Sequence, residues 1–541
     1  MAGSGRDALF EVLRTEGVRH VFGNPGTTEL PLVDALAAVD DIAYVLALQE
    51  ATAVGMADGY AQATGRPALL NLHTSAGLGN AIGNLTNAQA NGTPLVVTAG
   101  QQDRRHLHHD PLLAGDLVGL AAPVSKWTHE VSNLGELGTI VRRAFHDAAT
   151  APCGPVFVSI PMDLLEEEGD APVPVRSRIE RAAVPDAPLL DDLAARLQSG
   201  DRVAIVAGDE VAASGGVDAL VAVAEALGCP VHGSPLHSNV VFPTTHPLWR
   251  NALAPSATAI AAALAQYDTV LLVGGRAFMV YPYAPGPAVP SSLSLLHLSP
   301  DAHQLGRTWP VDLGLVGDPR ATLQALRTRL GAAVDLREAR RSREEADATF
   351  DAKARDGYAM VPMPPAAAAH ALLRALPAHT PVVDEAITTG SYVRGYLRAE
   401  VGEYFFCRGG GLGWGMPAAL GVSLARDRSP VLCVVGDGSA MYSPQALWTA
   451  VAQDLPVVFA VVNNRQYLIL KNYLRGMKAE TVRTGRFVAM DLDDPPVDFV
   501  ALARSMGVAG SLVEKAGDVG DAVRAALDSG KPHLLELPIS A

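Results

Sequence analysis

The chain has 541 residues, of which 49% are hydrophobic and 18% are charged, so it is neither a lone small module nor an intrinsically disordered protein. Its 42 basic and 57 acidic residues give a formal net charge of −15, and no stretch concentrates lysine and arginine, which argues against a nucleic-acid partner. Charged residues interrupt the N-terminal segment, and the longest apolar runs are far shorter than the roughly 20 residues that span a bilayer, so we expect no membrane partner and a cytoplasmic protein.

The first third of the chain alternates short apolar runs with helix-length segments rich in alanine and leucine. This alternation is typical of parallel βαβ units and predicts an α/β fold. The expected strands are residues 18–22, 42–48, 68–72 and 95–98.

The alternation lapses twice further along the chain. Residues 166–188 are acidic and rich in proline, which opposes helix and sheet and predicts a linker, and the charged segment 335–356 predicts a surface helix before a second linker. Between them we expect strands at 203–207, 230–232 and 270–273 and a helix at 217–227; after them, strands at 381–384, 431–435, 457–462 and 533–537. The sequence therefore predicts three doubly wound parallel-sheet domains, at 1–175, 190–335 and 357–541. It leaves open whether the first and third share a topology.

The four cysteines are widely separated and form neither a C-x-x-C metal pattern nor a disulfide framework. We expect them to be buried free thiols in a reducing cytoplasm. They are Cys153, Cys229, Cys407 and Cys433.

Residues 431–464 carry the sharpest chemical pattern: a strand, a Gly-Asp-Gly-Ser turn, a helix, a second strand and paired asparagines. Open α/β sheets bind ligands at the carboxyl ends of their strands, so Asp437 and Asn464 are expected to converge there. Carboxylate and carboxamide oxygens suit Mg²⁺, Gly438 would let the backbone approach a phosphate, and a helix beginning after Ser439 would favour its charge. The pattern predicts a magnesium–diphosphate site.

This segment resembles the signature of thiamine-diphosphate-dependent enzymes, and the resemblance extends over nearly the whole chain, most closely to the benzoylformate decarboxylase group. The other matching segments are FGNPGTTELP at 22–31, LALQEATAVGMADGYAQATG at 46–65, NLHTSAGLGNA at 71–81, PLVVTAGQQ at 94–102 and GGLGWGMPAALG at 410–421. The resemblance implies a pyrimidine-binding first domain, a largely structural central domain and a diphosphate-binding third domain. It also implies thiamine diphosphate and Mg²⁺ as cofactors, bound between subunits of a homodimer or homotetramer.

The same resemblance assigns the cofactor-binding residues. Glu50 is expected to hydrogen-bond the aminopyrimidine ring, and Leu412 to support the bent cofactor. Asp437, Asn464 and the main-chain carbonyl of Gln466 are the expected metal ligands. The other expected contacts are Asn24, Pro25, Gly26, Thr388, Gly410, Gly438, Ser439 and Tyr467.

The residues expected around the substrate keep some features of the family pattern and depart from others. His73 matches an active-site histidine and suits proton transfer because the pKa of imidazole is near neutral. Thr27 replaces a serine beside the substrate carboxylate and keeps a hydroxyl group. A second family histidine aligns with Tyr281, whereas His108 and His109 either supply the missing acid–base group or are surface residues.

Leu470 and Tyr473 match positions that line the substrate pocket. They are three residues apart and therefore share a helix face. Their apolar and aromatic character favours an aryl or bulky apolar substituent on the substrate.

The resemblance thus predicts a carbon–carbon lyase that decarboxylates a 2-keto acid to an aldehyde and can also join aldehydes. Two alternatives stay open: a 2-hydroxyacyl-CoA lyase or acetolactate-synthase-like carboligase, and a catalytically silent subunit that only binds the cofactor. The end of the chain lacks the basic C-terminal extension expected of a CoA lyase, and the central domain shows no flavin fingerprint. An intact set of Glu50, Leu412, Asp437 and Asn464 argues against a silent subunit.

Overall fold

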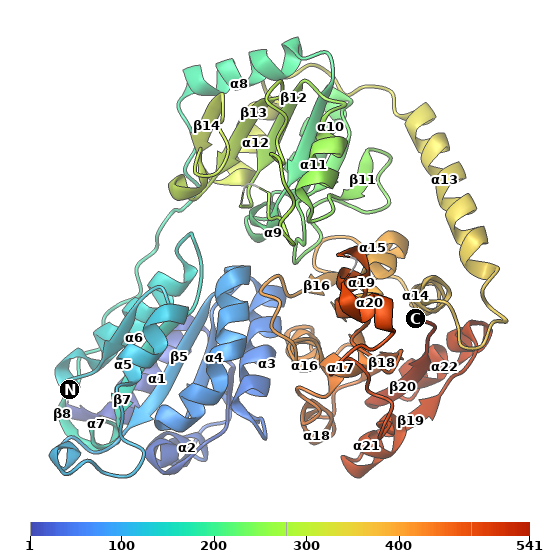
Figure 1. The fold of residues 1–541 in the computed structure, drawn as a ribbon. Helices are drawn as coiled ribbons and strands as arrows, with labels where there is room; N and C mark the ends of the chain where they lie inside the picture. Colours follow the sequence, from blue (N-terminus) through green and yellow to red (C-terminus); the bar gives the residue numbers. More distant parts are fainter. Residues whose placement is uncertain (1, 277, 478) are drawn as a thin grey trace.

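Three domains, each built on a six-stranded parallel sheet, make up the structure (Figure 1). It is a computed structural model that describes residues 2–276, 278–477 and 479–541. This architecture confirms the predicted α/β fold class. The domain boundaries expected from composition stay predictions.

The first domain has the strand order β3-β2-β4-β5-β7-β6. Every residue of β4, β5 and β7 is buried, because helices cover both faces of a parallel sheet. The strands are β2 (His20–Gly23), β3 (Ala43–Leu46), β4 (Ala68–Leu72), β5 (Leu95–Gln101), β6 (Thr128–Glu130) and β7 (Val156–Pro161); β1 (Ala2–Ser4) pairs with β8 (Glu168–Asp170). The helices are α1 (Gly5–Glu16), α2 (Leu30–Leu36), α3 (Glu50–Thr64), α4 (Thr74–Asn91), α5 (Leu117–Ala121), α6 (Leu134–Ala149) and α7 (Met162–Glu166).

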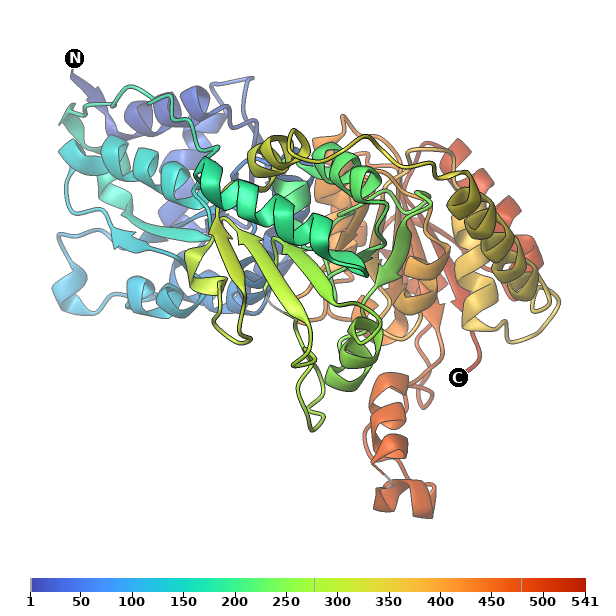
Figure 2. The same cartoon turned by 90° about the horizontal axis from the view of Figure 1, so that it is seen from above.

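The third domain repeats this topology, since its order β16-β15-β17-β18-β20-β19 is the same when strands are counted along the chain. Its strands are β15 (Val382–Glu385), β16 (Tyr404–Phe406), β17 (Val431–Gly436), β18 (Val457–Asn463), β19 (Ala509–Leu512) and β20 (His533–Pro538). Its helices are α14 (Pro365–Arg374), α15 (Gly390–Tyr396), α16 (Gly415–Ala425), α17 (Asp437–Ala440), α18 (Ala446–Ala452), α19 (Leu468–Gly476), α20 (Glu480–Thr484), α21 (Phe499–Ser505) and α22 (Ala516–Asp528). In Figure 2, α19 and α20 project from the body of this domain.

The central domain has a different order, β11-β10-β9-β12-β13-β14. Counted along the chain this is 3-2-1-4-5-6, the order of doubly wound dinucleotide-binding sheets. Its strands are β9 (Val203–Ala207), β10 (Val231–Gly233), β11 (Trp249–Ala252), β12 (Thr269–Val273), β13 (Ser294–Ser299) and β14 (Leu313–Val316). Its helices are α8 (Ala187–Ser199), α9 (Asp209–Ala213), α10 (Val217–Leu227), α11 (Ala257–Leu264) and α12 (Pro319–Arg327), and the charged helix α13 (Arg337–Arg355) leads to the third domain.

Helices α3 and α16 pack so closely that they join the first and third domains. A Cβ atom on Gly421 would lie 2.0 Å from the carbonyl oxygen of Met56, and one on Gly59 would lie 2.2 Å from that of Ala418. Only glycine permits this approach. One hydrophobic core therefore runs through both domains.

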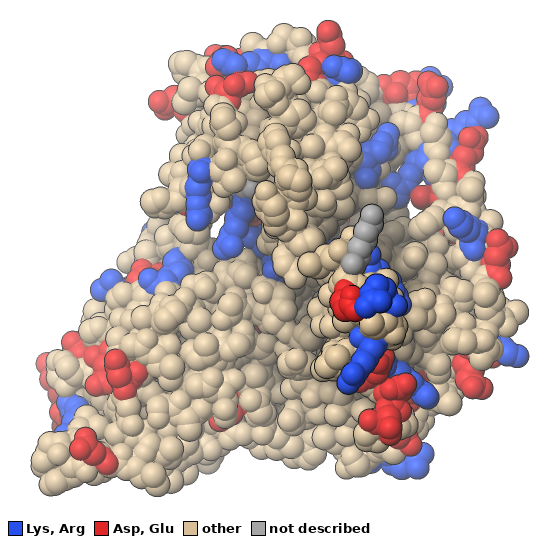
Figure 3. All heavy atoms as spheres, in the orientation of Figure 1, with Lys and Arg blue, Asp and Glu red and all other residues tan. Residues whose placement is uncertain are grey.

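Two surface properties bear on the sequence predictions. On the face shown in Figure 3, lysine and arginine side chains are dispersed among acidic ones. None of the helices in the described part of the chain combines the length and apolar character needed to cross a membrane.

All four cysteines are free thiols, but Cys153 is only partly buried, so the expectation that all four are buried was wrong for that residue.

Candidate active site

Three adjacent strands of the third sheet end beside the residues expected to hold the diphosphate. Thr388 follows β15, Asp437 follows β17 and Asn464 follows β18, and these strands are parallel neighbours. The helix at the turn begins at Asp437, not after Ser439 as expected, and has only four residues. The carboxylate and the carboxamide therefore share one edge of the sheet.

One oxygen of Asp437 is left without a partner. Its Oδ1 accepts a hydrogen bond from the Gly438 main-chain N–H at 2.9 Å, whereas Oδ2 is buried with no hydrogen-bond partner among the described residues. Burial raises the pKa of this carboxyl, and nearby main-chain N–H groups, including those of Arg465 and Gln466, lower it in part. A buried carboxylate oxygen with no donor fits a cation ligand.

The loop after β18 places the other expected metal ligands. The Asn464 Oδ1 accepts from the Gln466 main-chain N–H at 3.1 Å, and the Gln466 carbonyl accepts from Leu468 N–H at 2.9 Å, which leaves each oxygen a further lone pair. In the described part of the chain no cluster of three or more His, Cys, Asp or Glu could hold a metal, so any metal here would rely on amide and main-chain oxygens beside the single carboxylate.

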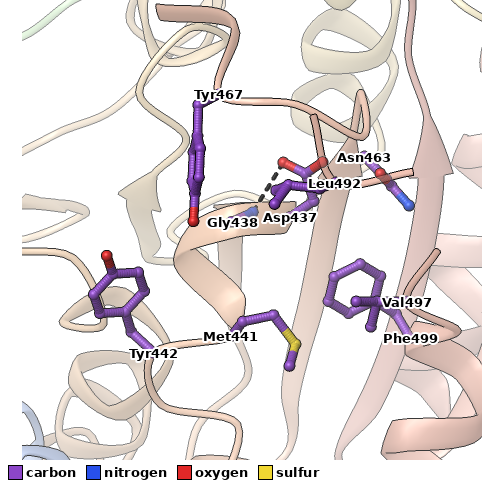
Figure 4. A pocket seen from close by; sticks show the side chains of 9 residues that line it. All are labelled: Asp437, Gly438, Met441, Tyr442, Asn463, Tyr467, Leu492, Val497 and Phe499. Atoms are coloured by element: carbon purple, nitrogen blue, oxygen red, sulfur yellow. Dashed lines mark hydrogen bonds between the residues drawn. The ribbon is translucent and has the colours of Figure 1, made fainter. Parts of the chain in front are cut away.

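A cavity of about 230 Å³ lies against this edge (Figure 4). A Cβ on Gly438 would lie 2.6 Å from the Tyr467 ring, so glycine lets the phenol stand beside the turn. The cavity is lined by Asp437, Gly438, Met441, Tyr442, Asn463, Tyr467, Leu492, Val497 and Phe499. The unpartnered oxygen, the space and the missing Cβ together fit a metal-bound diphosphate group.

At the first sheet, Glu50 lies beyond β3 and His73 beyond β4, two strands that have β2 between them. Glu50 is the first residue of α3. Its Oε2 accepts from the Asn80 side chain on α4 at 3.0 Å. His73 follows β4 directly and occupies the residue position before α4, without a side-chain hydrogen bond to the helix.

A buried glutamate that the sequence did not single out holds His73. The Oε2 atom of Glu29 lies 2.8 Å from His73 Nδ1, and Glu29 also accepts from the main-chain N–H groups of Gly26 and Gly100. A Cβ on Gly26 would lie 2.1 Å from the same ring nitrogen, so this glycine makes room for the imidazole. The signal was present in the sequence, because a glutamate three residues into a turn that enters a helix commonly bonds back to the turn's backbone.

The threonines of this turn differ in exposure. Thr27, expected beside the substrate, is exposed, whereas the buried Thr28 places its hydroxyl 3.2 Å from His73 Nδ1. In the same segment, Asn24 donates to the Ala47 carbonyl at 2.9 Å and fixes the loop that contains Pro25.

The remaining expected residues lie apart from this group. His108 and His109 lie on an exposed 3₁₀ turn, with ring centroids 3.8 Å apart and no side-chain hydrogen bond to other described residues. Tyr281 of the central domain meets Tyr473 of α19 edge to face at 5.8 Å, and Leu470 on α19 is exposed.

The loop at residues 407–414, between β16 and α16, contains Gly410 and Leu412 and is held by a second buried glutamate that the sequence did not single out. The carboxylate of Glu385 accepts from the main-chain N–H groups of Gly413, Trp414 and Gly415 at 2.7 to 3.0 Å. Gly410 has a φ of +76°, which glycine adopts without strain.

Comparisons with known proteins cover all three domains. Residues 3–120, 190–326 and 389–537 match the family models described as the N-terminal, central and C-terminal domains of thiamine pyrophosphate enzymes. The chain is 35% identical to benzoylformate decarboxylase from Pseudomonas aeruginosa, with 98% of each chain covered, and 28% identical to acetolactate synthase isozyme 3 large subunit from Escherichia coli, with 98% and 93% covered.

Solved structures give the same relationship. The thiamine diphosphate-dependent 4-hydroxybenzoylformate decarboxylase of Rhodococcus jostii matches with a TM-score of 0.88 and 31% identity over 99% of both chains. Benzoylformate decarboxylase from Polynucleobacter necessarius matches with a TM-score of 0.88 and 29% identity over 99% and 98%. The expected enzyme class, a thiamine-diphosphate-dependent carbon–carbon lyase, is confirmed by these matches. The chain belongs to the thiamine pyrophosphate enzyme family.

Proposed function

We propose that this enzyme, with Mg²⁺, decarboxylates a 2-keto acid that bears an aryl or bulky apolar substituent. The bond between the keto carbon and the carboxylate breaks, CO₂ leaves, and the former keto carbon takes up a proton to give an aldehyde. When bound, thiamine diphosphate supplies the electron sink for the pair left by CO₂. Joining of the product unit to a second aldehyde is proposed as a side activity.

The observation that carries this proposal is the His73–Glu29 pair at the carboxyl edge of the first sheet. Glu29 is buried and accepts from the main-chain N–H groups of Gly26 and Gly100, so it holds Nδ1 of His73 from a fixed position. The imidazole keeps its other ring nitrogen for proton exchange with the reacting carbon. We assign Thr27 to the substrate carboxylate, as a hydroxyl donor exposed beside this pair.

The chain's other residues bind and orient. We assign Glu50 to the aminopyrimidine ring, Asp437, Asn464 and the Gln466 carbonyl to Mg²⁺, and Leu412 to the support of the bent cofactor. Two of the relatives are named as decarboxylases of the aryl 2-keto acids benzoylformate and 4-hydroxybenzoylformate, and the aromatic pair Tyr281–Tyr473 with Leu470 gives an apolar surface for such a substituent. Further contacts are assigned to Asn24, Pro25, Gly26, Thr388, Gly410, Gly438, Ser439 and Tyr467.

A screen of aryl and alkyl 2-keto acids with Mg²⁺ and thiamine diphosphate tests the substrate class, with aldehyde and acyloin measured together. Aryl acids such as benzoylformate are expected to give aldehyde as the main product. Acyloin from pyruvate alone would instead support an acetolactate-synthase-like carboligase, which the relationship to the Escherichia coli enzyme keeps as the second candidate. Glu50→Gln is the control for a silent subunit, because equal rates in wild type and variant would refute catalysis.

We further propose that two copies of the chain complete each site. Within one chain Glu50 accepts from Asn80 in the first domain and Asp437 accepts from Gly438 in the third, so separate domains hold the two carboxylates. Exposed apolar side chains stand beside both edges, as expected of surfaces covered in a dimer or tetramer. They are Leu30, Leu48, Ile387, Met441 and Tyr442.

Mixing two inactive variants tests this arrangement. In a mixed dimer of Glu50→Gln and Asp437→Asn chains, one of the two shared sites has both carboxylates and the other has neither. If equal amounts reassemble at random, about a quarter of the wild-type activity is expected to return. No recovery in verified mixed dimers would show that each chain forms its own site.

The four free thiols suit a reducing compartment, and we propose a cytoplasmic location.

A further inference from the structure

The ligand edge of the central sheet is closed by the protein itself. Its strand order reverses between β9 and β12, which is where sheets of this topology bind dinucleotides. A Cβ on Gly208, just after β9, would lie 2.6 Å from the Cα and N atoms of Gly275, just after β12. The two loops are therefore in backbone contact across the position where a ligand would enter.

Acidic side chains fill the remaining space at this edge. Asp209 and Glu210 form the first turn of α9, where a phosphate group would otherwise lie, and the Glu210 carboxylate accepts the main-chain N–H of Gly275. Since carboxylates repel phosphate, this edge does not suit a nucleotide.

The partner of these carboxylates comes from the third domain. The guanidinium of Arg408 pairs with Asp209 Oδ2, and both side chains are less than 10% exposed. The other oxygen of Asp209 accepts from the main-chain N–H groups of Ser238 and Asn239 at 2.7 and 3.2 Å. The main chain of the central domain therefore fixes the position of Asp209 independently of Arg408.

Arg408 lies four residues before Leu412 in the loop at residues 407–414. The first domain holds the same loop, because Asn91 accepts the main-chain N–H of Arg408 at 3.0 Å and Asn87 bonds to both the N–H and the carbonyl of Gly411 at 2.9 Å. Glu385 holds its end within the third domain. All three domains therefore determine where the loop lies.

We propose that Asp209 and Arg408 are an interdomain positioning pair, by which the central domain sets the position of the Leu412 loop without touching substrate or cofactor. This proposal rests on the role proposed above for Leu412. It gives the central domain a part in catalysis, because a displacement of about 1 Å in a supporting loop can lower the rate about 100-fold.

Hydrogen exchange in the cofactor-free, full-length protein tests the positioning directly. Asp209→Ala is expected to speed amide exchange in residues 409–413 about tenfold, because the loop loses one of its fixed points. Asp351→Ala is the matched control, since it breaks a partly buried pair with Arg374 between α13 and α14. Unchanged exchange in Asp209→Ala, or an equal increase in the control, would overturn the proposal whether or not the enzyme decarboxylates 2-keto acids.

A double variant separates positioning from stability. Asp209→Ala leaves a buried cation unpaired, whereas Asp209→Ala with Arg408→Met replaces both charges by apolar groups, which commonly restores stability. We expect the double variant to recover only the part of the melting temperature that the unpaired charge costs, because the Ser238 and Asn239 N–H groups still lack their acceptor, and to keep about a 100-fold lower kcat and a weaker affinity for thiamine diphosphate with Mg²⁺. Recovery of kcat together with the melting temperature would show that the pair is only structural.

Discussion

The flanking domains and the central domain use the same kind of sheet for different purposes. The first and third sheets share one strand order and carry Glu50, His73 and Asp437 at their carboxyl edges, whereas the central sheet has the order typical of dinucleotide binding. Its edge is closed by the contact between Gly208 and Gly275 and receives an arginine from the neighbouring domain. Strand order therefore places an edge, and the few residues beyond each strand decide whether it binds a ligand.

The largest effect is expected at the edge of the first sheet. In Glu50→Gln the amide oxygen can still accept from Asn80, so the fold is expected to stay intact. Loss of the carboxylate is expected to lower kcat about 1,000-fold, within the range for positioned acid–base groups. Steady-state aldehyde release measures this, with Glu11→Gln on the exposed face of α1 as the control. An unchanged kcat would mean that the Glu50 carboxylate has no part in catalysis.

The edge of the third sheet is tested by ligand-linked stability. Asp437→Asn removes a buried charge that has an unpartnered oxygen, so the melting temperature of the cofactor-free protein is expected to stay the same or rise slightly. With the Mg²⁺–thiamine diphosphate complex at about 100 times its dissociation constant, the wild type is expected to gain about 2.7 kcal/mol and the variant almost nothing.

Thermal unfolding with and without both ligands, and again after chelation, measures this difference. The exposed Asp454, which pairs with Lys531, supplies the control variant Asp454→Asn. Equal ligand-induced shifts in the wild type and Asp437→Asn would remove Asp437 from the metal site.

Strands, helices and sheet edges could be predicted where the signal is local. The runs expected at 68–72 and 203–207 are β4 and β9, and the helix expected at 217–227 is α10, because an apolar run between turn residues fixes such an element. The charged segment at 335–356 forms α13, and the first and third topologies, left open by the sequence, are the same.

The supporting carboxylates could not be predicted because their partners are distant in the chain. Glu29 and His73 are 44 residues apart, and Asp209 and Arg408 are 199 apart. A single sequence shows neither pairing, since only the packed sheets bring these loops together. The difference between the exposed Thr27 and the buried Thr28 depends in the same way on a turn that closes against His73.

The closed edge of the central sheet is tested by adding one methyl group. Gly208 has φ −108° and ψ 175°, which alanine adopts freely, so the cost of Gly208→Ala is steric. Overpacking against the backbone of Gly275 is expected to cost about 1 to 3 kcal/mol of stability. Gly520→Ala inside α22, where a Cβ would meet only the Arg524 side chain, is expected to stabilise by up to about 1 kcal/mol. A Gly208→Ala variant as stable as the wild type would show that this crevice is open.

The most gradual effect is the pH dependence of stability that Glu385 gives the third domain. Burial raises the pKa of this carboxyl to about 7, although three main-chain N–H groups favour its charged form. The folded state thus binds the proton more tightly than the unfolded state, whose glutamate pKa is near 4.5. The stability that Glu385 contributes is therefore fully present below about pH 4.5, and it is lost as the pH rises to about 7. Glu385→Gln cannot titrate, so the difference in free energy of unfolding between wild type and variant should fall by about 1 kcal/mol per pH unit in this window. Denaturant unfolding of both proteins from pH 4.5 to 8 measures this difference. If the free energies of unfolding of wild type and variant change in parallel with pH, the three main-chain N–H donors at the start of α16 keep Glu385 charged throughout the range.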